Sequence, residues 1–404
     1  MAQKLSTQPY KGSRDFYPAD FRIREYIFGI WRDVCKSYGY EEYDGPFLES
    51  FDLYAAKSGQ ELVNEQLYSF TDKGGRKVAI RPEMTPTLAR MVAAKYKELE
   101  RPIKWFCIPN FWRYEKPQRG RGREFFQLNV DILGVEGPEA DFEVLSIAID
   151  IMKKTGAKEG MFELRINDRR LMNQLYSDLG LNDSQISTLN KNLDKKLELP
   201  EFLKNPQEIL NKLDKQGNAG AKSINFVLEA AKKAGIAVFI KFDPTIVRGL
   251  DYYTGMVFEQ YDLTPGNTRS MFGGGRYDDL LNIFIDEKIP ATGLAIGDVT
   301  FLNFLESWKL LPDLSATTDY LVTVWPSEDK KFMEASQKTV EKLRADGKSA
   351  EIWLDSSTKL EKQLKYADRK GIQNAVIIGE NELSQGKVTI KNLKTQKQET
   401  TTLD

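Results

Sequence analysis

This chain of 404 residues contains no histidine. That absence excludes Ser-His-Asp and Cys-His catalysis, histidine-ligated metals and acid–base chemistry at an imidazole. Cysteine is scarce as well, and Cys35 and Cys107 form no CxxC pair, so no zinc or disulfide framework is predicted. Chemistry in this chain must run on arginine, carboxylate and amide groups, with Mg²⁺ as the compatible metal. Reactions at phosphate fit this set, because they depend on positioning and charge stabilisation.

The sequence also lacks any long apolar run. No stretch approaches the roughly 18 to 20 apolar residues of a membrane-spanning helix, and residues 1–16 lack the apolar core of a signal peptide. With the scarce cysteines, these features predict a cytoplasmic protein with no membrane-embedded part. The net charge is −1, so any contact with nucleic acid must use local patches. A length of 404 residues predicts two or three domains.

Residues 111–134, FWRYEKPQRGRGREFFQLNVDILG, are the most informative stretch. Between Arg113 and Arg123 there are five Lys or Arg residues and one Glu, interrupted by Pro and Gly. An apolar strand at 103–107 leads in, and alternating apolar residues at 126–130 lead out. The pattern predicts two antiparallel strands joined by a long cationic loop.

The charges of this loop allow two interpretations. Guanidinium groups offer forked donors that suit phosphate oxygens, and they are present at Arg113, Arg121 and Arg123. On charge alone, a solvated hairpin tip is about as good an interpretation. A binding site is favoured by polar residues that alternate along the next strand and share one face: Gln127, Asn129 and Asp131. This face predicts a floor for a ligand that carries an ammonium group, with a phosphate above it.

The same stretch resembles motif 2 of the class II aminoacyl-tRNA synthetases, in the form found in histidyl-tRNA synthetases. In that form Arg-x-Glu-x-Pro-Gln precedes a Gly/Arg loop and Phe-x-Gln. Upstream, residues 18–38 predict an amphipathic helix, and residues 40–49 predict a strand whose Pro46 suits an edge or an interface. In the family this unit resembles motif 1, which makes the dimer contact. A core helix of a monomer is the alternative.

Residues 81–91, RPEMTPTLARM, predict a strand-to-helix junction that could face a pocket. Thr85 with Pro86 looks like a helix N-cap followed by proline in the first turn. Capping alone would explain Thr85 but would leave Glu83 without a purpose. The similar Arg-Pro-Glu-x-Thr of the synthetase family places this Glu and Thr on the ammonium group of the amino acid.

The middle of the chain contains a change of composition. Residues 138–154 predict a helix and residues 161–167 a strand, after which residues 170–235 are rich in Asn, Lys, Leu and Asp with helical spacing. The latter predict a small all-helical insertion. Its excess of Lys could contact RNA, although a solvated face is the better interpretation.

Two short segments after the insertion resemble histidine-specific motifs. Residues 246–259 read IVRGLDYYTGMVFE, and residues 271–280 read MFGGGRYDDL, with three consecutive glycines that let the backbone approach a ligand closely. Each segment is weak evidence alone. Together they resemble Arg-Gly-Leu-Asp-Tyr-Tyr and Gly-Gly-Arg-Tyr-Asp of histidyl-tRNA synthetases, a pairing specific to that family and its paralogues.

Residues 290–306 resemble motif 3 but depart from it at one position. The usual motif ends Gly-x-Glu-Arg, and that arginine lies over adenine and near the γ-phosphate. This chain has Gly297, Asp298, Val299 and Thr300 instead. The resemblance therefore leaves open whether another cation substitutes for the arginine, or whether ATP binding is weaker or lost.

The remaining chain, after a linker near 312–318, alternates short apolar strands with helices. This pattern predicts a separate domain, and it resembles the anticodon-binding domain of the family. The expected fold class is α/β: an α+β catalytic core with an antiparallel sheet flanked by helices, a helical insertion and a C-terminal α/β domain. The expected boundaries are 1–169 with 236–311 for the catalytic domain, 170–235 for the insertion and 318–404 for the C-terminal domain.

The resemblance implies ATP-dependent ligation of L-histidine to its tRNA through a histidyl-adenylate, by a homodimer that uses Mg²⁺. It implies catalytic roles for Arg113 and Arg248. Histidine-binding residues would be Glu83, Thr85, Gln127, Asp131, Tyr252, Tyr253 and Tyr277. ATP-binding residues would be Arg113, Arg121, Arg123 and Phe125. No metal ligands are identified.

Two alternatives remain open on the sequence alone. A catalytically silent paralogue, acting as a regulatory subunit or a sensor of uncharged tRNA, is favoured by Thr300. The presence of Arg113, Gln127 and Arg248 argues against it. So does the full C-terminal domain, because biosynthetic paralogues typically lack that domain. A bare tRNA-binding module would leave the histidine pocket unexplained.

Overall fold

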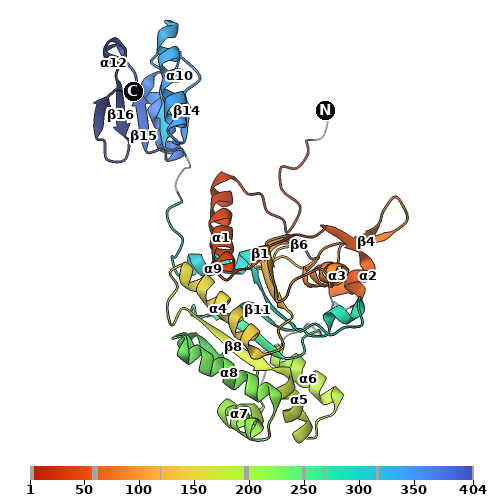
Figure 1. Ribbon diagram of the computed structural model, residues 1–404. Coiled ribbons are helices and arrows are strands. Elements are labelled where there is room, and N and C mark those ends of the chain that lie inside the picture. Colours follow the sequence, from red (N-terminus) through yellow and green to blue (C-terminus); the bar gives the residue numbers. More distant parts are fainter. Residues whose placement is uncertain are drawn as a thin grey trace. The chain divides into compact units, whose positions relative to one another are not determined.

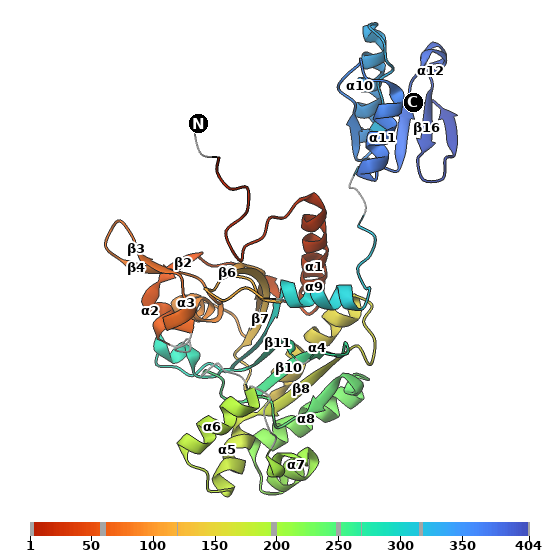
Figure 2. The same ribbon diagram turned by 180° about the vertical axis from the view of Figure 1, so that it is seen from behind.

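A computed structural model describes residues 4–56, 62–118, 120–194, 200–247, 252–267, 269–314 and 318–402. The chain forms two compact units, Met1–Leu311 and Pro312–Asp404. Figure 1 shows their helices and strands, and Figure 2 shows them from behind.

Within the described residues, the first unit is built on a nine-stranded sheet. Neighbouring strands in its centre are antiparallel, and the outermost pair at each edge is parallel. This arrangement, with its flanking helices, confirms the predicted fold class. In spatial order the strands are β1 (Glu41–Glu42), β5 (Ile103–Cys107), β7 (Glu124–Leu133), β12 (Ala291–Gly297), β11 (Ser270–Arg276), β10 (Met256–Asp262), β8 (Phe162–Asp168) and β9 (Ile240–Phe242), with β6 (Asn110–Trp112) paired to β7 outside this order.

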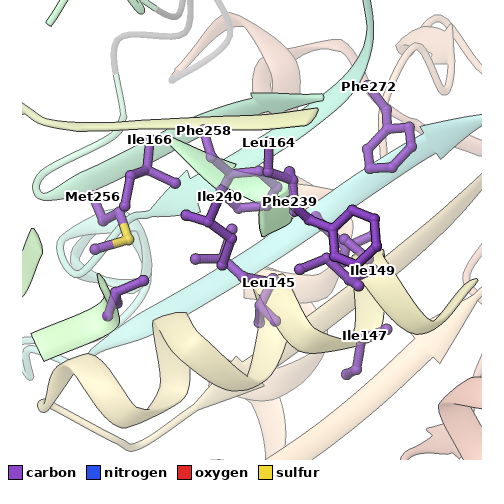
Figure 3. Close-up of a cluster of buried hydrophobic side chains, with 14 of the residues drawn as sticks. Leu145, Ile147, Ile149, Leu164, Ile166, Phe239, Ile240, Met256, Phe258 and Phe272 are labelled. Carbon is purple, nitrogen blue, oxygen red and sulfur yellow. The ribbon is translucent and has the colours of Figure 1, made fainter. Parts of the chain in front are cut away.

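Helices and one face of the sheet enclose the largest hydrophobic core. It includes side chains of α1 (Pro18–Ser37), α4 (Pro138–Lys154), α8 (Ala219–Lys233) and α9 (Asp298–Ser307). Figure 3 shows Leu145 and Ile149 of α4 facing strand residues such as Leu164. Helix α4 begins at a proline, has acidic residues in its first turn and lysines in its last, a distribution that suits the helix dipole.

Among the described residues, helices between Arg169 and Lys233 form the helical region predicted at 170–235. Polar side chains start three of its helices: Asp168, Asn205 and Asn218 each accept a backbone N–H of the following first turn. Apolar residues of α8 belong to the core of the main sheet, so this region packs within the first unit. Its elements before α8 are α5 (Arg169–Asp178), α6 (Asp183–Asp194), η2 (Glu201–Leu203) and α7 (Pro206–Lys215). The short helix η3 (Ala237–Phe239) follows the region and precedes β9.

A smaller, three-stranded sheet lies in the described N-terminal part of the first unit. It shows that the prediction of one strand at residues 40–49 is wrong. Residues 40–49 do not form one strand: β1 belongs to the large sheet, and β2 (Leu48–Ser50) pairs with β4 (Lys77–Ile80) in the small one. Pro46 lies between them and has no N–H to continue a ladder. β3 (Ser69–Thr71) pairs with β4 as an antiparallel hairpin, and the other elements here are α2 (Phe51–Ala55), η1 (Leu62–Gln66), α3 (Thr85–Lys95) and η4 (Leu280–Ile283).

The second unit is an α/β fold, as the sequence predicts. Its sheet has the order β14-β13-β15-β16-β17, with the first three strands parallel and the last two antiparallel. The final hairpin was not predicted, because its second strand consists of polar residues only. In chain order the elements are β13 (Tyr320–Val322), α10 (Lys330–Ala345), β14 (Ala350–Ile352), α11 (Leu360–Lys370), β15 (Asn374–Ile377), α12 (Glu380–Gln385), β16 (Val388–Asn392) and β17 (Gln398–Thr401).

A buried ion pair fastens the start of α4 to the end of β11. Arg276 Nε lies 3.1 Å from Asp141 Oδ2, and each side chain is only 2% exposed. The guanidinium also donates to the carbonyl oxygens of Val135 at 3.0 Å and Gly137 at 2.8 Å. Burial raises the pKa of Asp141 to about 6, against the opposing influence of the arginine. The pair fixes the strand end that carries Tyr277.

The Arg276→Lys substitution is expected to lower the free energy of unfolding by about 1 to 3 kcal/mol. A single ammonium group cannot replace the fork of donors that a carboxylate and two carbonyl oxygens accept here. Urea unfolding at neutral pH measures the change. The control is Arg32→Lys, which alters a partly exposed pair with Glu42 and is expected to cost under about 0.5 kcal/mol. Equal losses in both variants would contradict the prediction.

Candidate active site

A cavity of about 540 Å³ opens over the face of the large sheet that carries the polar residues of β7. Strands β7, β11 and β12, the start of α9, the loop before β7 and the start of α3 contribute its lining. The structure brings the following predicted site residues to it: Glu83, Thr85, Arg113, Arg121, Phe125, Gln127, Asp131, Tyr252, Tyr253 and Tyr277. Arg248 lies outside the described residues.

The floor of the cavity follows from the period of two along β7. Gln127, Asn129 and Asp131 line the cavity, whereas Leu128 and Val130 point into the helix-covered core. Pairing with β12 on one side holds this strand along its length, and β5 pairs with its second half. The polar side chains therefore project from a rigid element.

Asp131 is the carboxyl of the cavity floor, and it is buried. It is 5% exposed and accepts a hydrogen bond from the Tyr277 hydroxyl. Burial raises its pKa to about 7, and the bond from Tyr277 opposes this shift. The pKa of Tyr277 is raised by its own burial and then by the nearby Asp131. A side chain at Gly293 would place its Cβ 2.2 Å from Asp131 Oδ1, so glycine is required beside this carboxyl.

Three tyrosines pack together beside Asp131. The ring centroids of Tyr252 and Tyr253 are 5.0 Å apart, and those of Tyr252 and Tyr277 are 5.8 Å apart. A Cβ on Gly275 would lie 2.9 Å from the Tyr253 ring. The glycine triplet thus makes room partly for protein atoms, and of its three members only Gly273 lines the cavity. The close approach of backbone to a ligand that the triplet predicts is therefore possible at Gly273.

The capping explanation for Thr85 is wrong. Helix α3 begins at Thr85 itself, its N-cap position is Met84, and no side chain caps the helix. Thr85 and Glu83 both line the cavity, on the two sides of Met84. Both side chains therefore have a position from which they can reach a ligand.

Arg113 and Arg121 are the arginines on the cavity lining in the described part of the chain. Arg113 Nε donates to Pro82 O at 2.9 Å, and its guanidinium carbon lies 5.2 Å from the centroid of the Phe125 ring. These contacts hold the group in place. Within the described residues its Nη atoms make no hydrogen bond, so they can bind a ligand. Arg121 is more exposed: 60% of its side chain is accessible to solvent, and its Nη1 lies 3.4 Å from Glu115 Oε2.

Arg123 is not on the cavity lining. Its Nη1 donates to the Tyr10 hydroxyl at 2.7 Å, and its guanidinium carbon lies 4.0 Å from the centroid of the Tyr114 ring. Its backbone N–H donates to Gly12 O at 2.8 Å. The structure therefore separates Arg123 from the other predicted phosphate-binding arginines and joins it to residues 10–12.

The start of α9 forms the end of the cavity at which the sequence departs from motif 3. The Thr300 hydroxyl donates to Met271 O at 2.8 Å, which turns it toward the backbone. Asp298 also lines the cavity, and it accepts from Phe126 N at 3.0 Å and from Arg14 at 2.7 Å. Burial raises the pKa of Asp298, although Arg14 opposes the shift. Sequence reasoning missed this pair; an aspartate at the first position of a helix was the available signal.

Two kinds of structure are absent from the described residues. Among the described residues, no group of three or more Cys, Asp or Glu side chains is arranged to hold a metal ion. Among the same residues, no helix combines the length and apolar character needed to cross a membrane.

Comparisons with known proteins identify the family of this chain. Residues 12–198 and 197–299 match the family model for histidyl-tRNA synthetase, and residues 321–404 match that for an anticodon binding domain. The chain is 44% identical to a histidine–tRNA ligase of Leptospira biflexa, over 98% of this chain and 95% of the relative. It is 38% identical to a histidine–tRNA ligase of Halobacterium salinarum, over 96% of this chain and 94% of the relative.

A solved structure gives the same fold. The histidyl-tRNA synthetase of a Nostoc species aligns with a TM-score of 0.82 at 24% identity, covering 98% of this chain and 97% of that one. These matches confirm the family resemblance that the motifs indicated. The chain belongs to the histidyl-tRNA synthetase family of aminoacyl-tRNA synthetases.

Proposed function

We propose that this protein joins L-histidine to its tRNA in two steps within the cavity over β7. In the first, a carboxylate oxygen of histidine attacks the α-phosphorus of ATP, the bond to the β-phosphate breaks, and pyrophosphate leaves. In the second, a hydroxyl of the terminal ribose of tRNA attacks the histidyl carbonyl, and AMP leaves. The observation that carries this proposal is the joining of a buried Asp131–Tyr277 pair and the Arg113–Phe125 stack in one cavity.

The amino-acid end of the cavity suits histidine. The carboxylate of Asp131 can accept an imidazole N–H, with Tyr253 and Tyr277 beside it. An apolar competitor of similar size would leave that buried acceptor without a partner. We assign the ammonium group of histidine to three polar side chains that line the same cavity: Glu83, Thr85 and Gln127. Tyr252 packs against both other tyrosines and shapes the pocket.

The other end suits ATP. We assign Arg113 to the α-phosphate and the substrate carboxylate, where negative charge grows in the transition state. Phe125 would stack on adenine, and Arg121 would bind the outer phosphates. Arg248 would act opposite Arg113. We assign Arg123 to anchoring the loop on residues 10–12, because it bonds to Tyr10 and does not line the cavity.

The metal would come with the nucleotide. Since the described residues hold no cluster suited to a resident metal, Mg²⁺ would be carried by the phosphate oxygens of ATP, where it would neutralise charge. No step is assigned to a protein-held ion.

The partners follow from the two units. The anticodon-binding match to residues 321–404 supports tRNA as the acceptor. A homodimer through the segment predicted as motif 1 is supported by large apolar side chains exposed there: Phe21, Phe47 and Leu48. The proposed compartment is the cytoplasm.

A catalytically silent, regulatory protein is the second candidate, and Thr300 in place of the usual arginine is the observation that favours it. The deciding experiment is exchange of labelled pyrophosphate into ATP with histidine, using other amino acids as controls. Exchange that depends on histidine alone is expected. Folded protein that binds histidine or tRNA without any exchange would favour the regulatory candidate.

Removing the Arg121 side chain is expected to raise the KM for ATP by about tenfold to a hundredfold, the value of a charge-assisted hydrogen bond. The KM for histidine is expected to change by less than about twofold. A Cβ on Gly120 would lie 3.8 Å from Thr300 Cγ2, so the loop that carries Arg121 lies over Thr300. Introducing Thr300→Arg into the Arg121→Ala variant is therefore expected to restore part of the ATP affinity.

The measurement is pyrophosphate exchange at varied ATP. The matched control is Lys116→Ala, since Lys116 is an exposed residue of the same loop and does not line the cavity. A KM for ATP that moves equally in the Arg121 and Lys116 variants would argue against a specific role for Arg121.

A further inference from the structure

The end of β8 holds both sides of the segment that contributes the histidine-pocket tyrosines. On the near side, Asn167 Nδ2 donates to two backbone carbonyl oxygens, Pro244 O at 3.1 Å and Ile246 O at 3.0 Å. Asn167 is 2% exposed, and its Oδ1 accepts from Asp168 N at 2.8 Å. The amide is thus fully occupied inside the protein, and its donors serve only to hold this backbone.

The far side of the same segment is held two residues later. Arg169 Nη1 donates to Tyr253 O at 2.8 Å, and Arg169 N donates to Gly255 O at 3.0 Å. Its guanidinium carbon lies 6.0 Å from the centroid of the Tyr253 ring. Asn167 and Arg169 therefore hydrogen-bond to the backbone of residues 244–246 and 253–255 from a single strand-to-helix junction.

That junction is itself firmly anchored. Asp168, between the two, is fully buried and accepts from Arg170 Nη2 at 2.6 Å. Arg170 Nη2 in turn donates to Ser223 Oγ of α8 at 3.0 Å. A carboxylate with no exposure and a strong partner does not move without a large cost. The two residues that hydrogen-bond to residues 244–246 and 253–255 are therefore held in place by both the sheet and the helical region.

Asn167 and Arg169 do not reach the substrate cavity. Neither lines the cavity that contains Asp131, and both line a separate one on the other side of Tyr253, which borders both. The reaction assigned above uses neither residue. Their polar groups nevertheless end on the backbone that sets where Tyr253 stands.

We propose that Asn167 and Arg169 are positioning residues that set the affinity for histidine through Tyr252 and Tyr253. Because Arg169 is the first residue of α5, the helical region thereby acts on the amino-acid pocket and not only on its own fold. This inference rests on the proposed function, since it assumes that the tyrosines contact histidine. Arg248 belongs to the same segment of the sequence, so the proposal predicts a much larger effect on histidine than on ATP.

Three substitutions test the proposal in the full chain. Asn167→Asp keeps the size and Oδ1 of the side chain but removes both donated bonds and sets a second oxygen against two carbonyl oxygens. Arg169→Gln removes the long donor to Tyr253 O, and Arg169→Lys keeps one donor. The control is Arg165→Gln on the same face of β8, whose contacts go to Glu163, Asp243 and the Tyr261 ring.

The readouts are the Kd for histidine by titration calorimetry, both KM values by pyrophosphate exchange, and the melting temperature. Asn167→Asp and Arg169→Gln are expected to raise the Kd and the KM for histidine about tenfold, with the KM for ATP within about twofold. Arg169→Lys is expected to fall between Arg169→Gln and the unmodified protein. Arg165→Gln is expected to change none of the substrate constants.

Two results would overturn the proposal. One is a parallel rise of both KM values, and the other is a lowered melting temperature with an unchanged Kd for histidine. If Asn167→Asp does not fold, the Arg169 pair decides by the same criteria. Unmodified protein that binds histidine but shows no exchange would defeat the proposed activity, while the Kd comparison would still decide the positioning role. Absence of histidine binding would defeat both.

Discussion

Replacing Arg113 with alanine is expected to lower kcat for histidine-dependent pyrophosphate exchange by about a hundredfold to a thousandfold, or about 3 to 4 kcal/mol of transition-state stabilisation. The reason is geometric. The guanidinium is fixed on one side by Pro82 O and lies over the Phe125 ring, so its remaining donors are aimed before the substrates arrive. A donor that needs no reorganisation at the moment of reaction has its full effect on the charge that develops at phosphorus.

The Arg113→Lys variant separates charge from geometry. An ammonium keeps the positive charge but cannot donate to Pro82 O and to a ligand in the planar fork that arginine offers. It is expected to recover no more than about tenfold of the lost rate. The control is again Lys116→Ala, which should leave kcat unchanged. A KM effect without a kcat effect in Arg113→Ala would show that Arg113 binds ground and transition states equally, contrary to the role assigned to it.

The sequence predicted an element well where a single local pattern determines it. Helix α4 begins and ends at the residues the sequence indicated, because Pro138 fixes its first turn and a long apolar stripe continues to Lys154. The prediction of a single strand at residues 40–49 was wrong. The apolar pattern is weak there, and partner strands far away in the sequence decide the pairing. No local rule could assign β1 to one sheet and β2 to another.

The site divides in the same way. The period of two along β7 predicted that Gln127 and Asp131 share a face, and both line the cavity. Arg123 was predicted to bind ATP together with Arg113 and Arg121. A loop has no regular spacing that would show which of its charged side chains point the same way. The position of Arg123 depends instead on Tyr10, 113 residues away along the chain. The bond between Arg14 and Asp298 spans 284 residues and could only be seen in three dimensions.

The Asp131→Asn variant is expected to raise the KM for histidine by about thirtyfold to a hundredfold above pH 7, as expected for the loss of a charged acceptor in a buried site. Asparagine keeps the size of the side chain, and its Oδ1 can still accept from Tyr277. The loss would therefore report the charge and not the shape of the pocket. Exchange assays at varied histidine measure the effect, and an unchanged KM for ATP serves as the internal control.

The same variant is expected to remove a pH dependence. With a pKa of about 7, Asp131 becomes protonated as the pH falls from about 8 to 6, so histidine binding by the unmodified protein should weaken over that range. In Asp131→Asn this contribution disappears, and the ratio of the two KM values should shrink toward acid pH. A ratio that stays constant between pH 6 and pH 8 would show that the ionised carboxylate does not bind the imidazole.

The Asp131→Asn variant is expected to weaken histidine binding but to raise the free energy of unfolding. Asp131 has a pKa near about 3.9 in an unfolded chain and about 7 in the folded one, so folding favours its protonated form. Its contribution to stability is therefore greatest below about pH 4 and is lost as the pH rises through about 7. Asparagine cannot ionise and does not suffer this loss, so the variant should gain stability relative to the unmodified protein as the pH rises. The gain should approach a limit of the order of 4 kcal/mol above about pH 8 in urea unfolding. A protein that binds its substrate better when it keeps a destabilising charge would have its pocket arranged for the ligand and not for the fold.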